Sequence, residues 1–224
     1  MSGYKGQGAG VRLLRALRAP APPQPERCAF CAVALVPGHR HLADTEERAL
    51  VCACTACSLL FQRPGAGDGR YRAVPDRYLT DPGREPGEDV WTTLCIPVST
   101  AFVLHNTALG HPVLCYPSPA GATESELDES TWRSVFADNR LAAVLEPDVE
   151  ALLLRRPRGE RGERGERGEY HCFLVPVDIC YELVGRMRLH WRGFDGGTEA
   201  HRELDAFFAA VADRARPLPK EVAV

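Results

Sequence analysis

Short apolar segments in the second half of the chain predict β-strands. Residues 90–96, 101–105 and 112–116 are rich in β-branched or aromatic side chains and are bounded by proline, glycine or asparagine. Residues 149–154 and 170–175 have the same character. Strands this short, separated by turn residues, indicate an antiparallel sheet.

Three other segments repeat their apolar residues at helical spacing. Residues 128–136 start with capping residues, and Asp178 is the expected N-cap of a helix over 179–191. Thr198 is expected to cap a last helix that ends near residue 214. The two last helices each carry an apolar stripe (Ile179, Leu183, Val184 and Met187; Leu204, Phe207, Phe208 and Val211). We expect the three helices to cover one face of the sheet, and the last two to close an α+β domain over residues 88–215 as a helical hairpin.

The remaining segments are predicted to be irregular. Residues 1–26 form a flexible arm with a short basic amphipathic helix over 11–18, which either docks on the body or binds a partner, followed by a proline-rich linker. Residues 64–87 read as a connector and 216–224 as a tail. The Arg-Gly-Glu repeat over 157–169 has balanced charge and no apolar residue, so it is predicted to be disordered.

Composition narrows the class of protein. Of 224 residues, 45% are hydrophobic and 25% are charged, as in ordinary soluble globular proteins. The net charge of -3 argues against binding of nucleic acid or an anionic membrane by overall charge. No apolar run approaches the roughly 18 residues of a membrane span. Nine cysteines without a signal-peptide pattern favour a cytoplasmic protein with reduced thiols.

The spacing of four cysteines carries the clearest chemical signal. Cys28 and Cys31 form one C-x2-C pair, Cys54 and Cys57 form a second, and 22 residues separate the pairs. This spacing is typical of a tetrathiolate metal site built from two knuckles. With a turn at Pro37-Gly38 and a strand over 48–51 between the pairs, residues 27–63 are predicted to form a zinc-ribbon or rubredoxin-like module. So short a module has little core, so the metal is expected to supply most of its folding free energy, on the order of 10 kcal/mol.

The choice of metal depends on the residues after each pair. In rubredoxin-like iron sites a glycine usually follows each knuckle, whereas Ala32 and Ser58 stand there in this chain. These residues favour structural zinc, with iron as the alternative. Cys52 is interpreted as a small buried side chain, with a spare ligand or a redox-active thiol as alternatives. His39 and His41 could replace a cysteine ligand, but four sulfurs are already available, so the two histidines are expected at the surface or in contact with the ligands.

Outside this module the sequence gives no catalytic set of nucleophile, base and orienting group, so a non-enzymatic role is favoured. Cys180 lies near the start of its predicted helix, where the helix dipole would favour a thiolate. The other cysteines of the domain (Cys95, Cys115 and Cys172) are expected in the core. No ligand spacing supports a second centre built from these four. The acidic run over 124–129 reads as a solvated loop.

Several segments together resemble a bacterial family typically encoded beside uptake nickel–iron hydrogenase genes. They are residues 28–31, 39–42, 52–57, 116–125, 146–151, 174–178 and 190–193. The resemblance implies a non-catalytic accessory or chaperone-like protein of hydrogenase assembly, which would dock on a hydrogenase subunit or another assembly factor. The alternatives are a rubredoxin-like iron electron-transfer protein and a nucleic-acid-binding zinc ribbon, against which the mild acidity and the scarcity of lysine argue.

Overall fold

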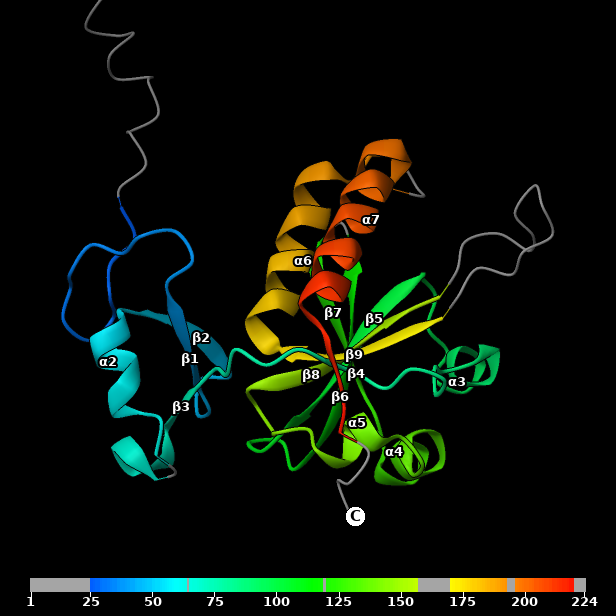
Figure 1. The fold of residues 1–224 in the computed structure, drawn as a ribbon, viewed down its shortest axis with the longest axis horizontal. Helices are drawn as coiled ribbons and strands as arrows, with labels where there is room; N and C mark the ends of the chain where they lie inside the picture. The colour runs from blue at the N-terminus through cyan, green and yellow to red at the C-terminus, as the bar shows by residue number, and fades with distance from the viewer. Residues whose placement is uncertain (1–24, 64, 119, 157–169, 193–195, 220–224) are drawn as a thin grey trace, which may run out of the picture.

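A computed structural model describes residues 25–63, 65–118, 120–156, 170–192 and 196–219. Within these residues the chain forms two sheets that lie side by side (Figure 1). The small sheet has the order β2-β1-β3, and the large sheet has the order β10-β4-β9-β8-β5-β6-β7. The predicted arm over 1–26 falls almost wholly outside the described residues, and the Arg-Gly-Glu repeat does so entirely.

The small sheet and the segments around it form the N-terminal module. Its elements are β1 (Arg40–Asp44), β2 (Ala49–Ala53), α2 (Thr55–Leu60), the 3-10 turn η1 (Ala66–Gly69) and β3 (Tyr71–Ala73). Strand β1 pairs antiparallel with both β2 and β3. The small core of the module contains Cys28, Leu42 and Ala53.

The large sheet forms the main domain. Its strands are β4 (Leu79–Thr80), β5 (Thr100–Asn106), β6 (His111–Ser118), β7 (Gly121–Glu126), β8 (Glu150–Arg155), β9 (His171–Pro176) and β10 (Arg216–Pro217). Its helices are α3 (Glu88–Thr93), α4 (Glu129–Phe136), α5 (Arg140–Ala143), α6 (Val177–His190) and α7 (Gly197–Arg214). The sheet is antiparallel except where β10 runs parallel to β4. The expected α+β class is therefore confirmed.

Helices cover both faces of the large sheet, which corrects the expectation of one covered face. Successive strand residues point to opposite faces, so Phe102 and Leu153 pack under α6 and α7, whereas Val103 and Leu152 pack against α3, α4 and α5. The central strands β5 and β8 are buried along nearly their whole length. Apolar side chains on both faces require two helical layers, which Figure 1 shows above and below the sheet.

The segment predicted as a strand over 90–96 is instead helix α3 followed by a turn. Val90, Trp91 and Leu94 are buried in one core cluster, because Leu94 follows Val90 by four positions and Trp91 by three, the spacings at which side chains meet on a helix face. Glu88 and Asp89 occupy the first turn, where carboxylates favour helix formation. The β-branched and aromatic composition therefore reflects burial rather than strand geometry.

The expected helix starts are confirmed in one case and wrong in two. Asp128 caps α4 by accepting a hydrogen bond of 2.9 Å from the backbone N–H of Thr131. Asp178 lies inside the first turn of α6, which starts at Val177. Helix α7 starts at Gly197, and Gly196 with φ of 90° precedes it in place of the predicted cap Thr198.

Several elements were missed because their residues are polar or too few. The acidic run expected as a loop forms much of β7, which pairs with β6 at the edge of the sheet. Charged residues suit an edge strand, because they discourage pairing with other chains. The predicted connector over 64–87 contains η1, β3 and β4.

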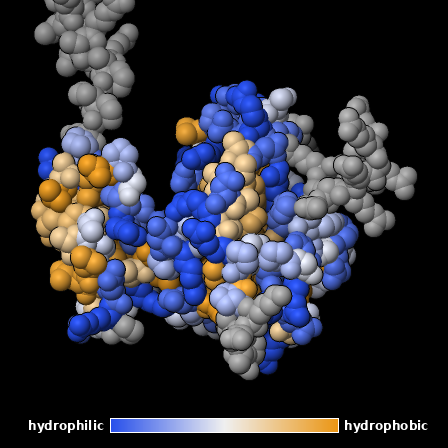
Figure 2. Space-filling view, in the orientation of Figure 1, coloured by the Kyte–Doolittle hydropathy of each residue, from blue (hydrophilic) through white to orange (hydrophobic). Residues whose placement is uncertain are grey.

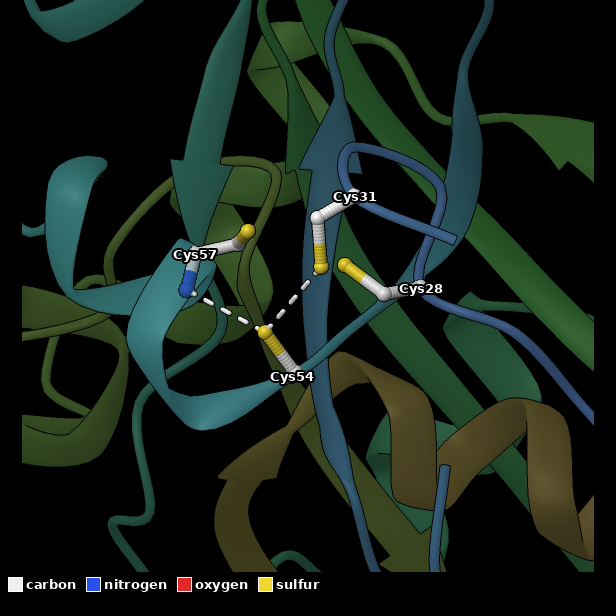
Figure 3. Close-up of side chains that lie close together, drawn as sticks. All are labelled: Cys28, Cys31, Cys54 and Cys57. Carbon is white, nitrogen blue, oxygen red and sulfur yellow. Dashed lines mark hydrogen bonds between the residues drawn. The ribbon is translucent and has the colours of Figure 1, made fainter. Parts of the chain in front are cut away.

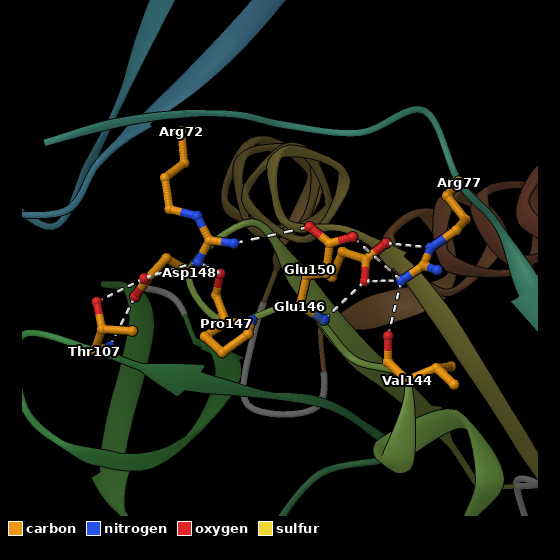
Figure 4. A network of polar contacts seen from close by, with 8 residues as sticks. All are labelled: Arg72, Arg77, Thr107, Val144, Glu146, Pro147, Asp148 and Glu150. Carbon is orange, nitrogen blue, oxygen red and sulfur yellow. Dashed lines mark hydrogen bonds and ion pairs between the residues drawn. The ribbon is translucent and has the colours of Figure 1, made fainter. Parts of the chain in front are cut away.

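Charged residues join the module to the main domain (Figure 4). Arg72 of β3 donates to the backbone oxygen of Pro147 at 2.6 Å and pairs with Asp148, which also accepts from Thr107. Farther along the chain, the guanidinium of Arg77 donates two hydrogen bonds, of 2.7 and 2.6 Å, to the carboxylate of the fully buried Glu150. Two-point guanidinium–carboxylate pairs fix direction as well as distance, so this junction orients the module on the domain.

Candidate metal centre

Four cysteine sulfurs of the module converge on one point (Figure 3). Cys28 and Cys31 lie in a tight turn before the hairpin, whereas Cys54 is the N-cap of α2 and Cys57 lies in its first turn. The four sulfurs all lie within 4.8 Å of one another, and those of Cys31 and Cys54 are 3.7 Å apart. Zinc–sulfur bonds of about 2.3 Å imply an edge of about 3.8 Å in a tetrahedral site. The cluster could therefore hold one metal ion.

Backbone hydrogen bonds shape the first pair into a knuckle. The N–H of Ala32 donates to the carbonyl of Cys28, and the N–H of Cys28 donates to that of Val33, each at 2.9 Å. Ala32 adopts φ of 59°, a left-handed conformation that glycine takes more readily. The alanine therefore keeps the turn in which rubredoxin-like sites usually place glycine.

The second pair differs from the predicted knuckle because a helix starts there. The side chain of Cys54 accepts a bond of 3.4 Å from the N–H of Cys57, as an N-cap residue does. Ser58 is an ordinary buried helical residue at the position where a second knuckle glycine was considered. The arrangement is thus a tight turn at the first pair, a hairpin, and a helix at the second pair. The rubredoxin-like form of the module stays a prediction.

The electrostatics of the cluster favour binding of a cation. Burial opposes ionisation of Cys28, but backbone N–H groups of Cys54, Phe30 and Cys31 direct their hydrogens to its sulfur and lower its pKa to about 6. Hydrogen bonding with Cys54 and burial raise the pKa of Cys57 to about 12. A metal ion must displace the Cys57 proton to gain its fourth thiolate, so binding at neutral pH releases protons.

Cys52 does not belong to this cluster. Its sulfur instead lies near ring nitrogens of His39 and His41, and the three potential ligand atoms are within 4.8 Å of one another. The His39 side chain is only 9% exposed, so it is not a surface group. Spacing alone did not predict this grouping, because the pairing register of the hairpin creates it.

The four remaining cysteines do not form a second centre. Cys115 and Cys172 lie in the two core clusters on opposite faces of the large sheet. Cys95 is exposed, which corrects its expected place in the core. Cys180 is fully buried, and burial raises its pKa well above the usual value, so the expected dipole-stabilised thiolate is wrong.

The surface of the module is unusually apolar (Figure 2). Its exposed large apolar side chains come from the first knuckle, from the turn before β1 and from α2 (Phe30, Val33, Val36, Leu59 and Leu60). Three other such residues occur in the described part of the main domain (Leu109, Tyr181 and Leu189). The signal in the sequence was the presence of apolar residues inside and directly after the cysteine pairs, where a solvated loop would be polar.

Comparisons with known proteins identify a family but not an activity. Over the residues that the structure describes, none of the helices is long and apolar enough to cross a membrane. No curated protein and no solved structure matches the chain. A model of a family of unknown function, DUF5947, matches residues 27–215, and the chain therefore belongs to this family.

Proposed function

We propose that this protein is a non-catalytic accessory protein that docks on a protein partner through its four-cysteine module. The observation that carries the proposal is the apolar surface of the module, which we call the knob surface (Phe30, Val33, Val36, Leu59 and Leu60). Val36 and Leu60 are 72% and 70% exposed. Clustered apolar side chains of this kind mark interaction sites more often than isolated ones do.

A rigid apolar surface is well suited to docking. Burial of one such side chain contributes roughly 1.5–3 kcal/mol, and a surface that is already ordered loses less conformational entropy on binding. Phe30 contacts the tilted ring of Phe61 and, edge to face, the ring of Tyr71, with centroids 4.9 and 5.1 Å away, so these rings support the turn of the first cysteine pair. A metal at the four sulfurs would tie this knuckle to α2, and the knob surface would be held as one unit.

Zinc is the proposed metal, with a structural role. Four thiolates fill a tetrahedral site and leave no position for a substrate, as in structural zinc sites. The helix at the second pair departs from the two-knuckle form of rubredoxin-like sites, which supports zinc over iron. The left-handed conformation of Ala32 supports the iron alternative, because glycine, which rubredoxin-like sites usually place here, takes this conformation most readily.

Metal content and colour separate these two functions. The purified protein is expected to contain zinc and to have no visible absorption. A red protein with stoichiometric iron and a reversible one-electron potential would replace the docking proposal with electron transfer.

The proposed partner is a subunit or an assembly factor of a nickel–iron hydrogenase. This part of the proposal rests on the resemblance of the cysteine, proline and tryptophan-containing segments described above. The partner surface is expected to be apolar, because the knob surface offers few polar groups.

Site-specific photocrosslinking in the native host tests docking and partner together. A photoreactive amino acid replaces Leu60 of the knob surface, and in a matched control it replaces Leu189, which is 72% exposed on α6. Position 60 is expected to crosslink to a hydrogenase subunit or assembly factor, with at least a tenfold excess over position 189. Equal products at both positions would refute docking by the knob surface. A crosslink to a second copy would assign the surface to self-association. A crosslink to residues 1–24 of the same chain would assign it to an intramolecular contact. Either result would refute docking on a hydrogenase partner.

A further inference from the structure

A second group of side chains that could ligate a metal lies at the β1–β2 hairpin, on the face opposite the module core. His41 and Cys52 are directly opposite each other in the strand register. His39 is two residues before His41, so an extended backbone directs both rings to the same side. Leu42 and Ala53 point to the other side and form the module core.

In both histidines the Nδ1 atom contacts an oxygen acceptor, as it usually does in histidines that bind a metal through Nε2. Nδ1 of His41 lies 2.9 Å from Oδ2 of Asp178 on α6. Nδ1 of His39 lies 3.2 Å from the backbone oxygen of Val36 and 3.5 Å from a carboxylate oxygen of Glu26. A histidine ligand usually donates its second N–H to a carboxylate or a backbone carbonyl, which fixes the ring and leaves Nε2 free to bind metal.

The Nε2 atom of His39 gives independent support. It is buried and has no hydrogen-bond partner, one of two such side-chain atoms in the described part of the chain. A buried polar atom left unpaired costs about 1–3 kcal/mol, so native proteins usually provide it with a partner. An ion bound between the histidines and Cys52 would satisfy this atom.

We propose that His39, His41 and Cys52 form a second metal site, selective for a borderline divalent transition-metal ion such as Zn²⁺. Two imidazoles and one thiolate are the donors that such ions prefer. A tetrahedral ion needs ligand separations of ~3.3–3.6 Å, so the three ligand atoms, which now lie within 4.8 Å of one another, would move closer together on binding. One thiolate and the Asp178 carboxylate together balance the two positive charges of the ion.

Three protein ligands would leave a fourth coordination position at this ion, and the two histidines, though not Cys52, line a cavity. A cavity of about 360 Å³ between the module and the main domain is lined by both histidines and by Asp178, Glu182 and Arg214. Zinc sites with three protein ligands keep a position for water or a small ligand. The site therefore differs from the closed four-cysteine site, and it joins the hairpin to α6 through the His41–Asp178 contact.

Metal stoichiometry of the full-length protein tests the proposal. After zinc loading and desalting, the wild type is expected to retain two zinc ions per chain. His41→Gln and Cys52→Ala are expected to retain one, in the four-cysteine site. Cys31→Ser is expected to retain none, because loss of the four-cysteine metal unfolds the β1–β2 hairpin that carries the second site. His190→Gln is the matched control, because His190 also pairs with a carboxylate but lies outside both clusters, and it should retain two.

Cobalt makes the two sites distinguishable and reports folding. Co²⁺ in the four-cysteine site gives intense thiolate charge-transfer bands, which must persist in the His41 and Cys52 variants to show that the module is folded. The second equivalent is expected to add ligand-field bands that these variants lack, and azide should shift only the added bands.

One zinc ion in the wild type, unchanged by the His41 and Cys52 variants, would overturn the second site. A water molecule would then be the expected hydrogen-bond partner of the buried Nε2 atom of His39. Two ions with azide-insensitive spectra would overturn the open position. Neither result affects docking by the knob surface, because these variants leave that surface intact.

Discussion

Removal of the metal from the four-cysteine site is expected to unfold the module and leave the main domain folded. The module core contains three buried side chains, Cys28, Leu42 and Ala53, of which only leucine is large. Burial of a leucine contributes about 1.5–3 kcal/mol, whereas a structural zinc ion contributes about 10–16 kcal/mol at neutral pH. Partly buried apolar side chains packed on this core, among them Leu35, Val51, Phe61 and Tyr71, each add less than full burial, so the metal is the largest single source of stability. The main domain has two large apolar cores of its own.

Hydrogen exchange measured by mass spectrometry can locate this effect. A strong zinc chelator is expected to bring amides of β1 and β2 close to the exchange rate of an unfolded chain. Amides of β5 and β8 should keep their protection, because both strands are buried in the large sheet. Cys31→Ser should reproduce the effect without chelator, and Cys95→Ser should not, because Cys95 is exposed and distant from both cysteine pairs in the sequence.

Two results would refute this reasoning. If β1 and β2 stay protected after metal analysis shows complete removal, the ion pairs and contacts with the main domain must hold the module. If β5 and β8 lose protection together with β1 and β2, the two parts unfold as one cooperative unit.

Three further predictions concern other parts of the fold. Arg77→Ala removes the charged partner of the buried Glu150 carboxylate, which keeps only the bond from the backbone N–H of Glu146. The free energy of unfolding in urea should fall by about 2–4 kcal/mol, somewhat less than for a fully enclosed pair because Arg77 is one-third exposed. Arg133→Ala in an exposed pair should cost under ~0.5 kcal/mol, and equal losses would contradict the argument. Hydrogen bonding from Arg70 lowers the pKa of Asp44, so its stabilisation is present above the unfolded value of about 3.9 and is lost as the pH falls through the lower folded value. Asp44→Asn should flatten that acid dependence in thermal unfolding curves, and an unchanged slope would refute it. In the native, metal-loaded protein a thiol reagent should modify Cys95 first, and mass spectrometry should find no early labelling of the thiols whose pKa burial raises (Cys115, Cys172 and Cys180).

Local sequence patterns were enough to predict features that depend on residues close together in the chain. The apolar stripe of α7 and the N-cap at Asp128 were predicted because both depend on neighbours within one or two helical turns. The four-cysteine cluster was predicted for a similar reason. Each C-x2-C pair is set by local spacing, and a single contact between the two pairs completes the cluster. Segment 90–96 was assigned wrongly because a buried helix and a buried strand of this length have similar composition.

The sequence by itself determined the α+β class, most strands and helices of the main domain and the four sulfur ligands, because these depend on spacing along the chain. Only the tertiary structure decided which helices lie on which face of the sheet and that α2 starts at the second cysteine pair. It also decided that Asp178 meets His41 across 137 positions and that Cys52 joins two histidines. Such contacts depend on strand register and on packing between distant segments, which no local spacing records.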